Sequence, residues 1–205
     1  FTNYTNSAMP NFNKILGEFN MRMAEGVVLE GDQQHYRQYP TYLVPIISTS
    51  SNLTKSVRDS IGYVFMPIAQ GLKVADENNK DITIESLLTT SESSFAKKDA
   101  QNMQNFDKAD GDEDGPFIVG AVAYKMLNSG KYSNEMQISI FTSASFATSS
   151  ANNMVSGANF ELVTNTVSWL LPEETKSSIP SKNVSVNYLT IPSSSATLWS
   201  NLLMI

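Results

Sequence analysis

Two segments of the chain carry apolar residues at intervals of three or four, the spacing of one face of a helix. We therefore predict helices over Pro10–Met23 and Asn159–Leu171. Pro10 suits a first helical turn, Gly26 lies where the first helix should end, and Pro172 stops the second. The apolar positions behind these predictions are Phe12, Ile15, Leu16 and Phe19 in the first segment and Phe160, Val163, Val167 and Leu170 in the second.

Apolar runs elsewhere predict strands interleaved with these helices, which indicates an α/β fold. The run Pro116–Met126 suits a strand buried on both faces, with a helix as the alternative, and Met136–Thr142 suits a central strand. A polar stretch over residues 96–115 predicts a long loop. Pro40 and Pro45 confine the extended segment Thr41–Ile47 to a sheet edge or to an irregular strand. The remaining predictions are strands at Val27–Asp32, Tyr63–Leu72 (broken by Pro67) and Asn183–Ile191, a strand from Ile84 into a Ser/Thr-rich turn before Phe95, and a short helix over Asn52–Ile61.

The composition narrows the classes of partner and chemistry. A net charge of -6 without a basic stripe argues against nucleic acid and against anionic membrane surfaces as partners. The absence of cysteine excludes disulfides and thiolate chemistry, and a single histidine, His35, must serve any Ser-His-Asp triad. Residues 131–205 hold only seven charged side chains among many Ser, Thr and Asn, which favours a location outside the cytoplasm.

A serine-bearing turn follows the strand predicted at Met136–Thr142. Ser143, Ser145 and Phe146 stand at the exit of a strand, where α/β enzymes often hold a nucleophile. Because ligands also bind at this position of a sheet, the three residues are candidates for ligand binding. A nucleophile elbow needs glycines for its strained backbone, and this turn has none. A turn that only caps the strand is therefore the favoured interpretation, and a serine hydrolase using Ser143 or Ser145 with His35 is the alternative.

A second candidate is the acidic loop Asp110-Gly-Asp112-Glu-Asp114-Gly115. Its alternating carboxylates match the first six positions of an EF-hand calcium loop, but Ala121 stands where a bidentate glutamate is needed. A calcium site of another kind, with Asp110, Asp112 and Asp114 as ligands, is one hypothesis, and a solvated acidic loop is the other. A further set of carboxylates, Glu18, Glu25, Glu30 and Asp32, is interpreted as solvated surface.

The order and spacing of segments along nearly the whole chain resemble the extracytoplasmic region of the gliding-motility-type auxiliary proteins of ABC transporters. Within it, Asn159, Asn165, Trp169 and Leu170 fit a helix pattern of that family, and Phe146 fits its strand-exit turn, where Ser143 stands near a position at which Asp is common. The segments that carry the resemblance are PNFNKILGEFNM, GVVLEGD, YPTYLVPII, LLTTSESSF, GPFIVGAVAY, ISIFTSASF, NFELVTNTVSWL and IPSKNVSVNYLTIP.

The resemblance implies a flavodoxin-like sheet with flanking helices, as in class I glutamine amidotransferases, with its N-terminal strands missing from this chain. It implies one extracytoplasmic domain over residues 1–192 and a C-terminal stub over 193–205 that leads to a membrane helix outside the chain. The apolar end of the chain, LWSNLLMI, is itself far shorter than the roughly 20 residues that span a bilayer. The start at Phe1, without a methionine, likewise predicts a piece of a longer protein.

For function, the resemblance implies a non-catalytic domain on the outer face of the bacterial cell membrane. It would belong to a membrane-anchored auxiliary component of an ABC-type transport system, with the permease and ATPase subunits as partners, and it would bind those subunits or an exported ligand. No cofactor is expected, apart from calcium on the acidic loop. Two alternatives stay open: the serine hydrolase or amidase, and a calcium-dependent binding module.

Overall fold

The computed structural model describes residues 9–76, 81–100, 105–129 and 132–171. The chain divides into two compact units, Phe1–Glu173 and Glu174–Ile205, and every described residue belongs to the first unit. The predicted strand Asn183–Ile191 and the predicted domain boundary at residue 192 lie outside the described residues. The helices within the described ranges are all too short or too polar to cross a bilayer.

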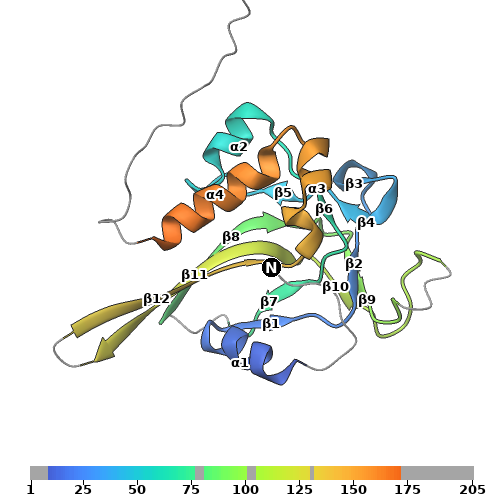
Figure 1. Cartoon of the computed structure of the whole chain (residues 1–205). Helices are drawn as coiled ribbons and strands as arrows, with labels where there is room; N and C mark the ends of the chain where they lie inside the picture. Colours follow the sequence, from blue (N-terminus) through green and yellow to red (C-terminus); the bar gives the residue numbers. More distant parts are fainter. Residues whose placement is uncertain (1–8, 77–80, 101–104, 130–131, 172–205) are drawn as a thin grey trace, which may run out of the picture. The chain divides into compact units, whose positions relative to one another are not determined.

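The described strands form three antiparallel sheets (Figure 1). The largest has the order β1 (Met21–Met23), β7 (Leu72–Val74), β11 (Ile118–Ser129), β8 (Ile82–Thr89), β5 (Ile46–Ile47), with β12 (Tyr132–Phe141) also paired to β11. A second sheet joins β10 (Glu113–Asp114), β9 (Phe95–Lys97) and β2 (Val27–Leu29), and a third joins β3 (Tyr36–Arg37), β4 (Tyr39–Leu43) and β6 (Met66–Pro67). The helices are α1 (Pro10–Glu18), α2 (Lys55–Ser60), α3 (Ser149–Met154) and α4 (Ala158–Leu170), with short 3-10 turns at η1 (Gln33–His35) and η2 (Ala144–Ala147).

The mixed α/β class predicted from the sequence is confirmed, but the flavodoxin-like arrangement is not. A flavodoxin-like sheet is built from parallel strands joined by crossover helices. Every pairing between described strands here is antiparallel, and β11, in the middle of the large sheet, forms a long hairpin with β12. Antiparallel neighbours need only short connections, so helices do not have to alternate with strands along the chain.

β11 is the centre of the large sheet, as the apolar run Pro116–Met126 predicts. Val119, Ala121, Val122 and Ala123 are all buried, because the strand has layers packed on both faces. The prediction that Met136–Thr142 is a central strand is wrong for the described strands. β12 pairs with β11 alone and lies at an edge, and its burial increases along the strand, from exposed at Glu135 and Met136 to buried at Ile140 and Phe141.

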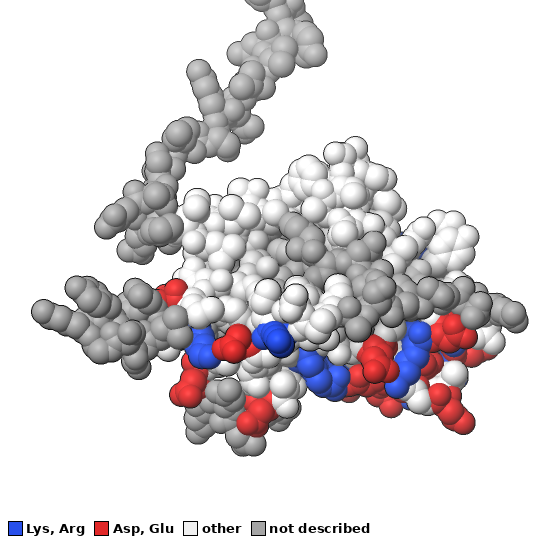
Figure 2. Space-filling model, turned by 60° about the horizontal axis from the view of Figure 1, so that its bottom comes forward, with Lys and Arg blue, Asp and Glu red and all other residues white. Residues whose placement is uncertain are grey.

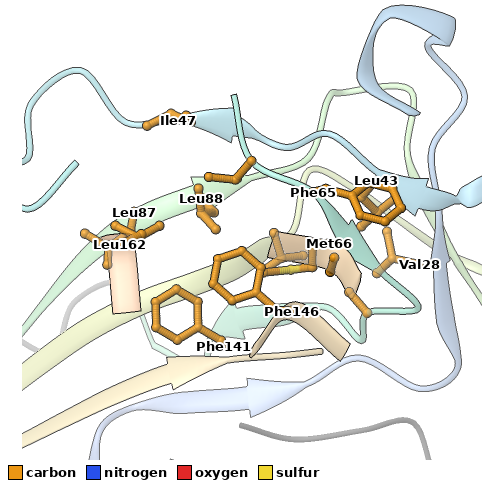
Figure 3. Close-up of a cluster of buried hydrophobic side chains, with 14 of the residues drawn as sticks. Val28, Leu43, Ile47, Phe65, Met66, Leu87, Leu88, Phe141, Phe146 and Leu162 are labelled. Carbon is orange, nitrogen blue, oxygen red and sulfur yellow. The ribbon is translucent and has the colours of Figure 1, made fainter. Parts of the chain in front are cut away.

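The two faces of the large sheet are covered by different helices (Figure 1). One core cluster joins Val122 of β11 to Leu162 of α4 and to the apolar residues drawn in Figure 3. The other joins Ala123, the next residue of β11, to Leu16 of α1. Because successive side chains of a strand point to opposite faces, these two adjacent residues belong to two separate cores.

The first predicted helix is shorter than the periodicity indicates. α1 ends at Glu18, and Met21–Met23 form strand β1 instead of a further helical turn. Asn20 causes the break. Its φ of 55° is left-handed, and its side chain exchanges two hydrogen bonds with the backbone of Asp76, at 2.6 and 3.0 Å, which aligns β1 beside β7.

The second predicted helix exists as α4, but of its predicted apolar stripe only Val163 packs against the core. Val167 is 50% exposed and Phe160 is 40% exposed, and the buried face carries Ala158, Asn159, Leu162 and Thr166. Asn159 sets this orientation. Its amide Nδ2 donates to the carbonyl oxygens of Phe65 (2.7 Å) and Phe146 (2.9 Å), and its Oδ1 accepts from the Phe65 N–H (3.1 Å).

The other predicted elements agree with the structure in part. The strand at Val27–Asp32 is confirmed as β2 and the short helix at Asn52–Ile61 as α2. Thr41–Ile47 is divided between β4 and β5, and only β5 lies at a sheet edge, because β4 pairs with both β3 and β6. The strand that enters a Ser/Thr-rich turn is β8. Tyr63–Leu72 is two separate strand segments, β6 and the start of β7, and the polar loop 96–115 contains β10 and the end of β9.

Candidate functional site

The serine turn at the exit of β12 is built as a packing element. Ser143 is buried and its hydroxyl donates to the carbonyl oxygen of Pro67. Phe146 is fully buried and its ring stacks on that of Phe141, with centroids 4.9 Å apart (Figure 3). Of the three residues singled out in this turn, only Ser145 keeps a half-exposed side chain, so the turn offers little surface to a ligand.

His35 shows no bond to this turn within the described structure. It lies in η1, and its Nδ1 is 3.2 Å from the carbonyl oxygen of Val44. The backbone also ties the two residues, because the Val44 N–H donates to the carbonyl of His35 at 2.7 Å. A nucleophile–base pair requires a side-chain hydrogen bond, and none joins His35 to Ser143 or Ser145 among the described residues.

The three acidic residues proposed as calcium ligands have separate roles. Asp112 has a side chain only 4% exposed, and its carboxylate accepts from the N–H groups of Ala109 (2.9 Å) and Lys98 (3.0 Å). Asp114 forms an ion pair with Lys108 at 2.5 Å. Asp110 is exposed. Across the described ranges, no group of three or more His, Cys, Asp or Glu side chains could hold a metal ion.

The carboxylates Glu18, Glu25, Glu30 and Asp32 do not come together either. Glu18 pairs with Lys125 (3.2 Å) and Glu25 with Lys98 (3.0 Å) at the surface. The interpretation of all four as solvated surface is wrong for Glu30, which is 2% exposed.

The buried carboxylate of Glu30 organises the turn between β8 and β9. It accepts hydrogen bonds from the Ser91 hydroxyl (2.5 Å), the Ser91 N–H (3.0 Å) and the Asp32 N–H (3.1 Å). Gly31 lies so close to this turn that a Cβ on it would be 2.5 Å from the carbonyl oxygen of Ser93. Three donors at one carboxylate satisfy its hydrogen-bonding capacity inside the protein, so Glu30 joins two loops and is a structural residue.

Charge gathers in a band on one side of the molecule (Figure 2). Among the charged residues of the described chain, Arg22 of β1 holds Glu113 of β10 with two hydrogen bonds of 2.5 and 3.2 Å, and Lys73 of β7 lies 3.3 Å from the same carboxylate. The Arg22 hydrogen bond lowers the pKa of Glu113, and Lys73 adds to the effect. The same pairing raises the pKa of Arg22. Both cations share one carboxylate, so the charge of Glu113 is already paired within the protein.

A groove beside β5 and β8 is a concave surface in the described part of the chain. It encloses about 530 Å³ and is lined by hydroxyl side chains, by Ile46 and Ile47 of β5, and by Glu85 of β8. Ser48 and Ser50, on the loop after β5, form part of its wall, and their hydroxyl oxygens are 3.0 Å apart. A cavity of this size suits a small ligand or a short peptide segment.

Sequence reasoning missed this groove because it depends on which strands are neighbours. The alternation of isoleucine with Thr83 and Glu85 is the one signal in the sequence, since it indicates a strand with a polar face. Neither residue type nor spacing shows that β5 is too short to cover β8. Comparisons of the chain with protein-family models, with curated proteins and with solved structures found no match.

Proposed function

We propose that this chain is a non-catalytic binding domain on the extracytoplasmic face of a bacterial membrane, part of a membrane-anchored auxiliary component of an ABC-type transport system. The observation that carries the non-catalytic part is the use of the strand-exit turn for packing. The hydroxyl of Ser143 is committed to the Pro67 carbonyl, and Phe146 fills the core. A serine nucleophile needs a free hydroxyl beside a general base.

The groove between β5 and β8 supports a binding role, because it is open to solvent and lined by polar groups. The assignment to ABC transport rests on the resemblance in segment order described above. The low charge of residues 131–205 supports the location outside the cytoplasm. The flavodoxin-like arrangement implied by the same resemblance is not part of the proposal, because the described sheets are antiparallel.

The test is recovery of partners from membranes. The intact protein, tagged at its terminus, is crosslinked in cells, extracted with detergent and purified, and the bound proteins are identified by mass spectrometry. We expect an ABC permease and an ATPase subunit to be enriched over a tagged, unrelated membrane protein. Recovery of neither subunit after efficient crosslinking would refute the transport assignment.

A further inference from the structure

The edge of β8 is only partly covered by other strands. On one side β11 pairs with β8 from Ile82 to Thr89. On the other side β5 pairs only with Leu88 and Thr89, and one further hydrogen bond joins the Ser48 N–H to the Leu87 carbonyl at 2.9 Å. Among the described strands, none pairs with residues 82–86 on that side. An uncovered strand edge presents backbone donors and acceptors that can pair with an incoming strand.

The sequence of this open edge carries one of the features that usually block strand addition, a single charge. Proteins protect exposed edges with proline, with charged side chains (lysine above all) or with a bulge. Residues 82–86 read Ile-Thr-Ile-Glu-Ser, so Glu85 is the one charge and neither proline nor lysine is present. The register between β8 and β11 does shift near Gly120, but on β8 the shifts lie between Ser86 and Thr89, at the covered end of the strand. The open part is therefore regular enough to pair.

The groove lies alongside the same edge. Its lining includes Thr83, Glu85 and Ser86 of the open segment, and Ile46, Ser48 and Thr49 form part of the facing wall. Ile46 is 42% exposed, so an apolar side chain of a bound segment has a surface to cover. A strand added at the edge of β8 would gain backbone hydrogen bonds from β8 and side-chain contacts from the groove, as in β-strand addition by peptide-binding domains.

Glu85 determines the charge of the expected occupant. Its side chain is half-buried in the groove, and it forms no hydrogen bond or ion pair with the other described residues. Arg58, a cation that contacts the groove wall, is already bound to the Ser48 carbonyl (2.5 Å) and to the Thr54 hydroxyl (3.0 Å). A carboxylate with no protein cation favours a cationic group on the ligand.

The same residue argues against a second copy of this chain as the occupant. Pairing of two β8 edges would bring one Glu85 carboxylate toward the other, and like charges on adjacent strands destabilise the pairing. We infer that the open edge of β8 binds an extended segment of a partner protein that places a lysine or arginine against Glu85. The inference rests on the proposed binding function and names the kind of partner surface that the domain recognises.

The first test is a selection with displayed random nonapeptides on the folded chain, followed by synthesis of an enriched peptide as the probe. We expect enriched peptides to carry a basic residue at a fixed position, flanked by β-branched or aromatic residues. Glu85→Gln should weaken binding of the probe about 3- to 10-fold, and Glu85→Lys should weaken it more. Two further probes each carry one N-methyl group, placed on adjacent residues beside the basic residue. One of the two should lose binding, because alternate N–H groups of a strand face its neighbour and the methyl group removes one of these donors.

The matched control is Glu135→Lys, the same change of charge at an exposed position of β12 in the same sheet. It should leave the affinity within about twofold, provided that both variants keep the thermal melting temperature of the parent. Selection of no basic peptide, an equal loss of affinity in both variants, or tight binding of both N-methylated probes would overturn the inference.

The outcome is separable from that of the membrane experiment. Peptide binding that depends on Glu85, with no transporter subunits recovered from membranes, would keep the inference and refute the transport assignment. Recovery of the subunits in equal amounts by the intact protein and its Glu85→Lys variant, with no basic peptide selected, would refute the inference and keep the transport assignment.

Discussion

The side-chain amide of Asn159 pairs with the backbone of Phe65, 94 residues earlier in the chain, as the peptide group of an adjacent strand would. It accepts from the Phe65 N–H and donates to the Phe65 carbonyl, and a third hydrogen bond reaches the carbonyl of Phe146 in η2. Asn159 is fully buried. One residue thus fixes α4 against the segment before β6 and against the turn at the exit of β12.

We expect Asn159→Ala to be among the more destabilising substitutions in the chain. It would leave the N–H and carbonyl of Phe65 and the carbonyl of Phe146 without partners in a buried place, and each such group costs about 1–3 kcal/mol. A loss of about 2–4 kcal/mol in the free energy of unfolding should result, because the groups can relax in part. Urea unfolding followed by circular dichroism measures it.

Asn165 is the control for this prediction, because it lies on the same helix and also donates from Nδ2. Its partners are the carbonyl of Leu53 (2.9 Å) and the hydroxyl of Ser56 (3.0 Å), and its side chain is only half-buried. Asn165→Ala should cost less than about 1 kcal/mol, since water can replace the lost bonds. Equal losses of unfolding free energy in the two variants would show that the buried hydrogen bonds to Phe65 stabilise the fold no more than the half-buried ones of Asn165.

Asn159 also shows why sequence reasoning predicted the existence of α4 but not its orientation. Periodicity identifies a helix and assigns its apolar stripe to the core, because apolar burial usually dominates. Here a buried asparagine with three hydrogen bonds turns Phe160 and Val167 to the surface. The central strand β11 could be predicted without knowing its distant partners, because a strand covered on both faces is apolar throughout.

The candidate sites were predicted from residue types. The role that each candidate residue has in the structure depends on hydrogen-bond partners far away in the sequence. The sequence places Ser143 at a strand exit, but Pro67, which takes its hydrogen bond, is 76 residues away. Likewise Glu30 precedes a loop in the sequence, and Ser91, whose hydroxyl donates to the buried Glu30 carboxylate, is 61 residues away. Single-sequence patterns carry no information on such pairs, and the groove of β8 depends on strand neighbours in the same way.

Ser143→Ala tests the structural role of the strand-exit serine. It should lower the free energy of unfolding by about 1 kcal/mol, because the buried Pro67 carbonyl loses its donor. Ser145→Ala, at a half-exposed position, should change it by less than about 0.5 kcal/mol. Thermal melting of the two variants beside the parent measures both changes.

A fluorophosphonate probe provides the chemical readout for the same turn. We expect no covalent label on the folded parent chain, because neither serine has a general base within the described structure. A label that disappears in Ser145→Ala and stays in Ser143→Ala would identify Ser145 as a nucleophile and restore the hydrolase hypothesis.

The ion pair of Arg22 and Glu113 predicts a change of stability with pH. Because Arg22 lowers the pKa of Glu113 in the folded state, its stabilising contribution is complete above the ordinary value of 4.5 and is lost as the pH falls through the lowered pKa. The pair is partly exposed, so the contribution is at most about 1 kcal/mol. Glu113→Gln should therefore melt lower than the parent at pH 7.

The gap in melting temperature between the parent and Glu113→Gln should close as the pH is lowered below 4.5, because the parent then loses the same charge. It should also narrow at high salt, which screens exposed pairs. Lys108 and Asp114 form a more exposed pair that serves as a comparison, and Asp114→Asn should show a smaller gap at pH 7. A gap that is constant from pH 7 to pH 3 would contradict the assignment.

Substitutions of Asp112 and Asp110 distinguish a structural role of the acidic loop from a calcium-binding role. Its carboxylate caps the loop through the N–H groups of Ala109 and Lys98 and lies 4.0 Å from Lys97, so Asp112→Ala should cost about 1–3 kcal/mol of folding free energy. Asp110→Ala, at an exposed position, should cost less than about 0.5 kcal/mol. Millimolar calcium should leave the melting temperature of the parent unchanged, since the carboxylates of Asp112 and Asp114 already have protein partners. A calcium-dependent rise in that temperature that is lost in Asp110→Ala would instead show that the three carboxylates converge on the ion.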